Sequence, residues 1–211
     1  MKKQIYLIDL AHESNLGLSS DTMPLQLGLI GAYCLKEHGL KTDVKIFKFV
    51  GDFLKAMKKE KPFIIGVSNY LWNINIGYKL ISEIKKKYPN IITIFGGPNY
   101  PEGLKDQIEW LKKHPYVDFY VYKDGEISFS RLVGELFKNP DLNSVKKLKL
   151  PSCHSLINNK PYFGELEPRI KDLSAIPSPY VTGLMDDFFE YRLIPMIQTA
   201  RGCPFTCAYC C

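Results

Sequence analysis

Four cysteines near the end of the chain are the residues best placed by type and spacing to do chemistry. They lie at positions 203, 207, 210 and 211, in the sequence RGCPFTCAYCC, and the chain has six cysteines in all. Cys203, Cys207 and Cys210 have the spacing C-x3-C-x2-C, which lets one tight loop direct three soft thiolates at one [4Fe–4S] cluster. The fourth iron would then lack a protein ligand and be open to a small molecule. Cys211 is expected not to be a ligand.

Two other interpretations of these cysteines remain open. Structural zinc normally takes four closed ligands, often as two separated pairs, but Cys34 and Cys153 are distant single residues. Cys210 and Cys211 are adjacent, so they are poorly placed to share one tetrahedral ion. The second alternative is a chance group of thiols. The spacing favours the iron–sulfur cluster over both.

A second set of candidate residues follows the ends of apolar segments. Ligands of open α/β sheets bind beyond the carboxyl ends of the strands. Small residues there let a bulky group approach the backbone, and an indole ring offers a flat apolar surface. Each candidate also has a plainer interpretation: a tight turn for the glycines, a helix cap for the serine, and packing at a helix start for the tryptophan. The candidates are Ser68, Trp72, Gly96, Gly97, Pro98, Gly125 and Glu126.

Alternating strand and helix patterns must position these residues. Apolar runs predict strands at residues 4–10, 42–47, 62–68, 91–95 and 117–122, and helical patterns fill 22–38, 52–59, 74–87, 101–113 and 126–137. Five β/α units of this length predict an α/β fold, with one parallel five-stranded sheet covered by helices on both faces. Runs rich in Ile and Val fit burial of both faces. By analogy we expect a flavodoxin-like (Rossmann-like) strand order of 2-1-3-4-5.

The alternation breaks after Asn139-Pro140. Residues 155–163 could form a hairpin that turns at Asn158-Asn159, and a stretch punctuated by prolines follows. This stretch lacks Gly/Ser runs and is predicted to be an ordered connector. A short strand is expected at residues 193–199, directly before the cysteines.

Composition narrows the class of protein. The net charge is +6, but the lysines are scattered, and several fall at the ends of predicted helices, where cations complement the helix dipole. No basic stripe with interleaved aromatics suggests nucleic-acid binding. No apolar run approaches the ~20 residues of a membrane helix, and the start of the chain does not fit a signal peptide. We therefore expect a cytoplasmic protein.

The segment from Arg201 to Cys210 resembles the signature RGCPxxCxYC of radical S-adenosylmethionine (SAM) enzymes. Upstream segments are similar to those radical SAM enzymes that carry a cobalamin (B12)-binding domain before the cluster motif. These segments are SNYLWN after the third strand, Gly96-Gly97-Pro98, residues 123–126 and the connector DLSAIPSPY. The resemblance covers nearly the whole chain.

The resemblance implies cofactors, sites and partners. Cys203, Cys207 and Cys210 would hold the [4Fe–4S] cluster, and Tyr209 would lie against the adenine of SAM. Cobalamin would bind at the second set of candidate residues. The implied reaction is radical chemistry such as methyl transfer, fed by an external electron donor of the flavodoxin or ferredoxin type. The substrate would be a small molecule or a lipid.

The resemblance also implies domain limits, namely a cobalamin-binding-like domain at residues 1–138, a connector at 139–192, and the first strand and cluster loop of a truncated radical SAM barrel at 193–211. Two departures from the family pattern stand out. Lys123-Asp124 replaces the usual Gly-Glu, and the Asp-x-His-x-x-Gly motif of His-ligated cobalamin proteins is absent, because His12 has the wrong spacing. We therefore expect no histidine on cobalt and a nucleotide tail held near Gly96 and Gly97. The alternatives are a non-catalytic corrinoid-binding module and a zinc-stapled binding domain.

Overall fold

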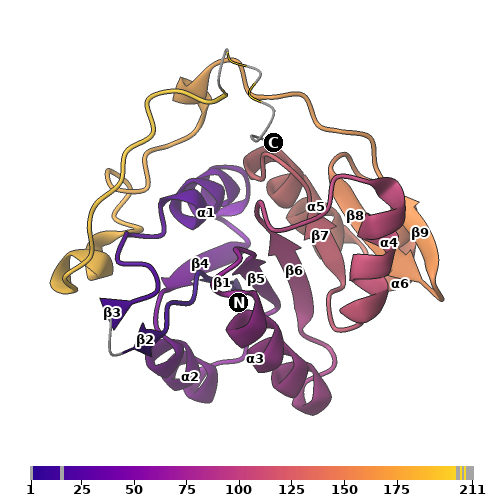
Figure 1. The fold of residues 1–211 in the computed structure, drawn as a ribbon, viewed down its shortest axis with the longest axis horizontal. Coiled ribbons are helices and arrows are strands. Elements are labelled where there is room, and N and C mark those ends of the chain that lie inside the picture. The colour runs from indigo at the N-terminus through magenta and orange to yellow at the C-terminus, as the bar shows by residue number, and fades with distance from the viewer. Residues whose placement is uncertain (1, 15–16, 203–204, 206, 208–211) are drawn as a thin grey trace.

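The computed structural model describes residues 2–14, 17–202, 205 and 207 (Figure 1). Its main sheet contains five parallel strands, β1 (Lys3–Ile8), β4 (Thr42–Phe47), β5 (Ile64–Ser68), β6 (Ile92–Gly96) and β7 (Phe119–Val121). They lie in the order β4-β1-β5-β6-β7. In order of occurrence along the chain this is 2-1-3-4-5, so the predicted α/β class and flavodoxin-like order are confirmed.

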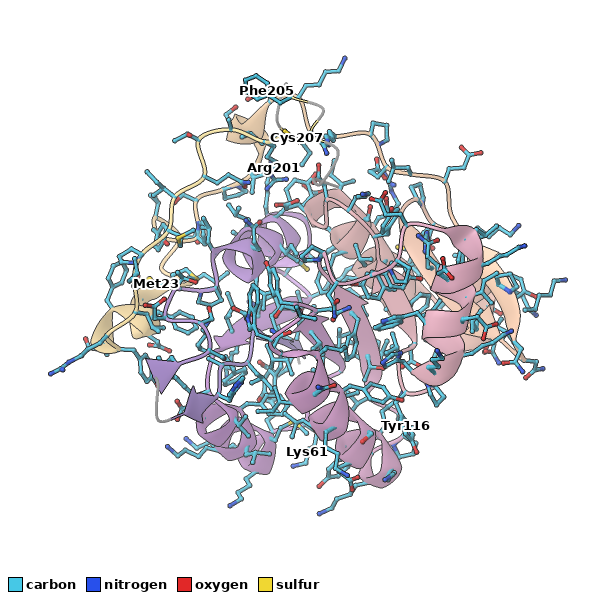
Figure 2. All side chains as sticks on the ribbon, in the orientation of Figure 1. Met23, Lys61, Tyr116, Arg201, Phe205 and Cys207 are labelled. Atoms are coloured by element: carbon cyan, nitrogen blue, oxygen red, sulfur yellow. The ribbon has the colours of Figure 1, made fainter. Side chains whose placement is uncertain are left out.

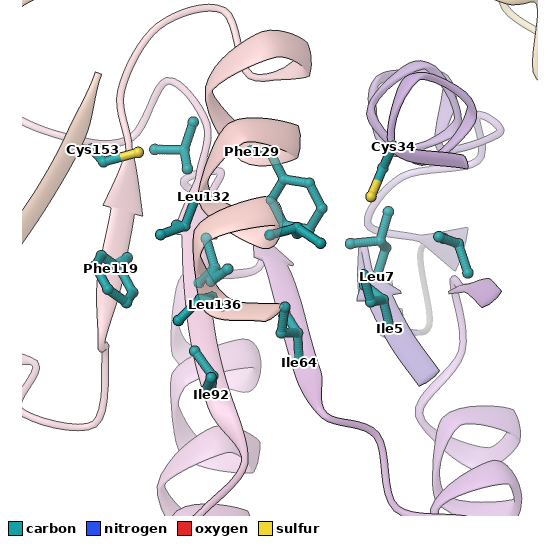
Figure 3. Close-up of a cluster of buried hydrophobic side chains, with 14 of the residues drawn as sticks. Ile5, Leu7, Cys34, Ile64, Ile92, Phe119, Phe129, Leu132, Leu136 and Cys153 are labelled. Carbon is teal, nitrogen blue, oxygen red and sulfur yellow. The ribbon is translucent and has the colours of Figure 1, made fainter. Parts of the chain in front are cut away.

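Helices cover both faces of this sheet. They are α1 (Leu25–His38), α2 (Val50–Lys59), α3 (Ile74–Lys87), α4 (Leu104–Lys113), α5 (Glu126–Lys138) and α6 (Leu142–Lys147). Successive strand residues point to opposite faces, so Ile5 and Leu7 of β1 join one apolar cluster while Tyr6 and Ile8 join the other. The first cluster packs under α1, α5 and α6 (Figure 3), and the second packs under α2, α3 and α4. Burial of both faces explains why the strand sequences do not alternate between apolar and polar residues.

The hairpin predicted within the connector extends the sheet. Strands β8 (Cys153–Ile157) and β9 (Lys160–Phe163) pair antiparallel, and β8 also pairs antiparallel with β7, so the sheet has seven strands instead of the five expected. Asn158 and Asn159 form the turn with φ of 50° and 63°, a conformation that asparagine tolerates better than most residues. The domain limit at residue 138 stays a prediction, but the sheet itself continues to Phe163.

The strand expected at residues 193–199 is not formed. Only Ile194 makes a β-bridge, parallel to Thr22. The Ile194 N–H donates to the Asp21 carbonyl at 2.8 Å, and the Met23 N–H donates to the Ile194 carbonyl at 2.9 Å. A strand is held by a ladder of backbone hydrogen bonds to a neighbouring strand, and among the described residues this segment finds such a partner at one position only.

The connector is packed against the body of the protein. It contains two short 3-10 helices, η1 (Leu173–Ala175) and η2 (Asp186–Glu190), and Met185 and Phe188 at η2 form a small core with Met23 and Leu193. A small two-stranded ribbon, β2 (Glu13–Ser14) with β3 (Gly17–Leu18), lies in the loop after β1. In Figure 1 the connector arches over the ends of α1 and α5 before it reaches the tail. Within the described part of the chain, no helix is both long and apolar enough to cross a membrane.

Candidate functional site

A pocket of about 470 Å³ lies at the carboxyl ends of β5, β6 and β7. Its volume falls in the usual range of ~300–1,000 Å³ for small-molecule sites. Apolar side chains from the strands, α1 and α5 line it, including Leu7, Leu27, Ile30, Ile94, Val121 and Phe129. The opposite wall comes from the end of the chain, through Gln198, Ala200, Arg201 and Gly202. The pocket therefore joins the sheet to the segment that leads into the cysteines.

Six of the seven residues predicted as cobalamin contacts line this pocket. They are Ser68, Gly96, Gly97, Pro98, Gly125 and Glu126. The seventh, Trp72, is not among the described lining residues. Its ring stacks on Tyr70 with centroids 4.5 Å apart and is about half exposed, and Tyr70 itself lines the pocket.

A glycine directly after β6, Gly97, is required by the backbone of a neighbouring loop. Gly97 has φ of +131°, and a Cβ there would lie 2.6 Å from the Asn69 carbonyl oxygen. The Asn69 N–H donates to the Gly96 carbonyl at 2.6 Å, and the Tyr120 hydroxyl donates to the Gly97 carbonyl at 2.8 Å. The tight-turn interpretation is thus confirmed for Gly97, and the turn forms part of the pocket wall.

Ser68 belongs to a buried polar network beneath the pocket. Its hydroxyl donates to Asp9 Oδ1 at 2.5 Å, and Asn73 Nδ2 donates to the same oxygen at 3.1 Å. The other carboxylate oxygen of Asp9 accepts from Lys48 Nζ at 2.9 Å, and the Lys48 side chain is fully buried. A buried ion pair is tolerated only with such additional hydrogen bonds. The Ser68 hydroxyl therefore donates its proton to Asp9, so this hydroxyl could only accept a hydrogen bond from a ligand.

The turn after β7 contains the departure from the family pattern. Lys123 adopts a left-handed conformation with φ of 63°, which favours glycine, and its ammonium donates to Glu102 Oε1 at 2.5 Å. Asp124 Oδ2 is buried and has no hydrogen-bond partner among the described residues. Since Asp124 lines the pocket, its carboxylate offers an unused acceptor to a ligand.

Two arginines outside the predicted set complete the site. The Arg201 guanidinium forms a two-pronged ion pair with Glu126, with Nη1 at 2.9 Å from Oε2 and Nη2 bonded to Oε1, and its Nε donates to Gln198 at 3.1 Å. The hydrogen bonds to Glu126 raise the pKa of Arg201. Arg169 lines the pocket beside Gly202, and no hydrogen bond or ion pair is recorded for it among the described residues. Only the position of Arg201 next to the cysteine motif could have signalled its role.

No histidine is among the described residues that line the pocket. His12 is exposed, and its backbone N–H and carbonyl both bond to Ser19. His38 binds the Ser130 carbonyl, and His114 binds the Trp110 carbonyl. His154 is buried against Phe163, and burial lowers its pKa to about 4.

The cysteine loop is only partly described. Cys207 is exposed and free, and Figure 2 shows Arg201 on the body side of Cys207 and Phe205. Cys203, Cys210, Cys211 and Tyr209 lie outside the described residues. In the part of the chain that is described, no group of three or more His, Cys, Asp or Glu residues is placed to hold a metal. Cys34 and Cys153 are buried, and burial raises the pKa of each thiol to about 12.

Comparisons with known proteins agree with this geometry. The chain is 29% identical over 201 residues to the cobalamin-dependent radical SAM methyltransferase TokK of Streptomyces tokunonensis. The aligned region covers 89% of this chain and 28% of TokK. It is 29% identical over 199 residues to 2-(S-pantetheinyl)-carbapenam-3-carboxylate methyltransferase of Streptantibioticus cattleyicolor, with the same two shares covered. The chain thus spans little more than a quarter of the length of these curated relatives. No family model matches it.

Among solved structures, the cobalamin-dependent SAM radical enzyme OxsB with aqua-cobalamin and SAM bound matches with a TM-score of 0.71 and 17% identity. The match covers 99% of this chain and 28% of OxsB. This likeness shows a shared fold.

Proposed function

Because this chain is a homologue of cobalamin-dependent radical SAM enzymes, we propose that it binds a corrinoid in the pocket and a [4Fe–4S] cluster on Cys203, Cys207 and Cys210. One observation carries the proposal. Turns from three strand ends and the segment that precedes the cysteines meet in a single pocket. A site for one cofactor thus adjoins the chain segment that leads to the site for the other.

The residues of the pocket fit a corrinoid in their chemistry. Its apolar floor suits the macrocycle, and two polar groups remain free for the periphery. Asp124 Oδ2 can accept a hydrogen bond from a carboxamide or a ribose hydroxyl, and the Arg169 guanidinium can bind the phosphate of the nucleotide tail. A whole corrinoid is larger than the pocket. We propose that the nucleotide tail enters near Gly96 and Gly97 while the macrocycle lies over the strand ends.

The bound groups would define the chemistry. The corrinoid would supply a methyl-carrying cobalt, and the cluster would supply the electron that cleaves SAM and starts radical chemistry such as methyl transfer. This chain's own residues would bind and orient these groups and shield them from solvent. We propose that Tyr209 packs against the adenine of SAM and that a flavodoxin or ferredoxin supplies electrons in the cytoplasm. The substrate would be a small molecule or a lipid.

The two alternatives make different demands on the chain. A non-catalytic corrinoid module would bind the corrinoid without assembling a cluster. A zinc staple would need a fourth ligand beside the three thiolates of the motif, and Cys34 and Cys153 are poor candidates because they are buried and burial raises the pKa of each thiol. This observation favours the iron–sulfur cluster over zinc.

Aquacobalamin titration, followed by absorbance, tests the proposal. We expect one equivalent to bind. Gln26 is an exposed pocket-lining residue of α1, and Gln26→Trp should fill part of the cavity and lower the affinity at least about tenfold, equivalent to about 1.4 kcal/mol. Glu37→Trp, at an exposed position of the same helix outside the lining, is the matched control. Equal affinity in both variants would place the corrinoid elsewhere.

A further inference from the structure

The ion pair between Arg201 and Glu126 links the pocket to the cysteine motif. We propose that Arg201 is a positioning residue, held by Glu126, that makes occupancy of the pocket and the placement of the cysteine loop depend on each other. This inference rests on the proposed function. It assigns Glu126 a role different from the direct cofactor contact predicted from the sequence.

The ion pair between Arg201 and Glu126, called the anchor below, is held by several hydrogen bonds. Both carboxylate oxygens of Glu126 accept from the guanidinium, and Gln198 accepts from Nε. The side chains are 3% and 10% exposed for Glu126 and Arg201. Glu126 is the first residue of α5, where the helix dipole stabilises a negative charge. Its carboxylate is fully engaged by Arg201 and is not free for a ligand.

Occupancy of the pocket by a ligand can affect the anchor because both of its residues line the pocket. Gly125 and Glu126 line one side, and Ala200, Arg201 and Gly202 line the other. Cys203 follows Arg201 by two residues, and an extended chain spans at most about 3.6 Å per residue. The ion pair therefore limits how far the first cysteine lies from the pocket. A ligand that contacts both walls would bind best when Arg201 and Glu126 are paired, and would therefore favour that arrangement.

Neutralising the anchor should release the segment. In Glu126→Gln the buried guanidinium would lose its counter-charge, which is strongly unfavourable in a site of low exposure. The segment at residues 198–202 can avoid this by leaving the wall, because residues 195–200 are exposed and make few hydrogen bonds to the rest of the molecule. Arg201→Lys keeps the charge but loses the two-pronged geometry, so its effect should be intermediate.

The chain offers a matched control for these variants. Arg131 of α5 forms an ion pair with Glu167 of the connector. This pair also joins α5 to a later segment of the chain, but neither residue is among those lining the pocket. Glu167→Gln and Arg131→Lys therefore remove the same kind of interaction away from the site.

Hydrogen–deuterium exchange of the segment at residues 194–202 gives a readout independent of activity. In the apo protein, Glu126→Gln should speed exchange of the hydrogen-bonded amides of Ile194 and Met196 in this segment at least about tenfold, since one buried ion pair is worth more than about 1.4 kcal/mol when one partner is removed. Arg201→Lys should give a smaller increase, and Glu167→Gln should match wild type. Added aquacobalamin should slow exchange in wild type and Glu167→Gln but not in Glu126→Gln. Circular dichroism should show the same helix and strand content in all variants.

Three outcomes overturn the inference in distinguishable ways. If wild type binds aquacobalamin and Glu126→Gln is protected to the same degree, the anchor transmits nothing, although the proposed function stands. If wild type binds no aquacobalamin, the proposed function is wrong, and the proposed coupling is then wrong as well. Equal apo exchange in Glu126→Gln and Glu167→Gln would show that the ion pair does not hold the segment.

Discussion

Individual polar side chains at the strand ends fall into two groups. The Asp9 carboxylate is shared among Ser68, Asn73 and Lys48, and the Glu126 carboxylate is taken by Arg201. Asp124 Oδ2 and the Arg169 guanidinium have no recorded partner among the described residues. A buried polar atom without a partner is unfavourable, so a ligand gains by binding the buried Asp124 oxygen, while the exposed Arg169 guanidinium is free to pair with an anionic group.

The three spaced cysteines carry the first prediction at this scale. Anaerobic reconstitution with iron and sulfide should give about four irons and four sulfides per chain. Replacing Cys203, Cys207 or Cys210 with Ala should abolish the 400-nm-region absorbance of the cluster, because each thiolate binds one iron. Cys211→Ala is the control and should retain full iron content. A Cys211 variant as defective as the other three would contradict an open iron site, and stoichiometric zinc in place of iron would support the staple.

Gly97 carries a prediction about stability. With φ of +131° and only 2.6 Å between a built Cβ and the Asn69 carbonyl oxygen, Gly97→Ala should destabilise the protein by about 2–4 kcal/mol. Urea unfolding measures this change. Gly51→Ala is the control, because Gly51 lies in α2 with nothing within 4 Å of a built Cβ. That variant should be neutral or more stable by about 0.5–1 kcal/mol. Equal stability of both variants would mean that the turn rearranges freely.

The hairpin β8–β9 is an element that sequence patterns identified only in part. Its turn at Asn158-Asn159 was predicted, but its pairing with β7 was not. Local sequence specifies a hairpin through turn residues and side-chain alternation. It does not specify which exposed sheet edge the hairpin will join, because that depends on the unpaired backbone of β7 and on shape. The result is an α/β sheet whose edge is closed by antiparallel strands.

His154 makes the docking of this hairpin sensitive to pH. It lies in β8, stacks on Phe163 with ring centroids 4.1 Å apart, and its Nδ1 lies 3.3 Å from the Tyr100 hydroxyl. The facing titratable groups are Tyr100 and Tyr122, and burial raises the pKa of Tyr100. Burial lowers the pKa of His154 to about 4 from the ordinary value of 6.5, so the unfolded chain binds the proton more readily than the folded protein.

The consequence is a loss of stability in mild acid. As pH falls from about 6.5 to 4, protonation of His154 should favour the unfolded state by up to about 3 kcal/mol. The measurement is urea unfolding at pH 4.5 and pH 7.5 for wild type and His154→Gln. The variant should lose less stability between the two pH values than wild type does. His12→Gln, at an exposed position, should keep the wild-type dependence. An unchanged dependence in His154→Gln would show that the imidazole is not buried in its neutral form.

Across the whole molecule, sequence patterns predicted what is local or periodic. The five parallel strands and their order were predicted, and six of the seven residues predicted as cofactor contacts, which follow strand ends, line the pocket. Trp72 stays a prediction: it is not among the described residues that line the pocket, but its ring stacks on Tyr70, which does line it. Arg169 was missed because it comes from the connector, and Arg201 because it follows the connector, whose path depends on long-range packing such as that of Met185 and Pro179 against Gly28 of α1. Periodicity carries no signal for such contacts.

The placement of all four histidines predicts how cobalt would be held. His38 lies between α1 and α5, His114 follows α4 at the opposite edge of the sheet from the pocket, and His154 is buried in the hairpin. His12 is exposed in the loop after β1 and is absent from the lining. Protein nitrogen should therefore not bind cobalt, and the nucleotide base should lie in the pocket. A cobalt without a strong lower ligand is more easily reduced, which suits remethylation by SAM. Electron paramagnetic resonance of the cob(II)alamin complex should lack nitrogen superhyperfine splitting in wild type and in His12→Ala alike. A triplet splitting in wild type that disappears in His12→Ala would make His12 a ligand and require the loop after β1 to move onto the pocket.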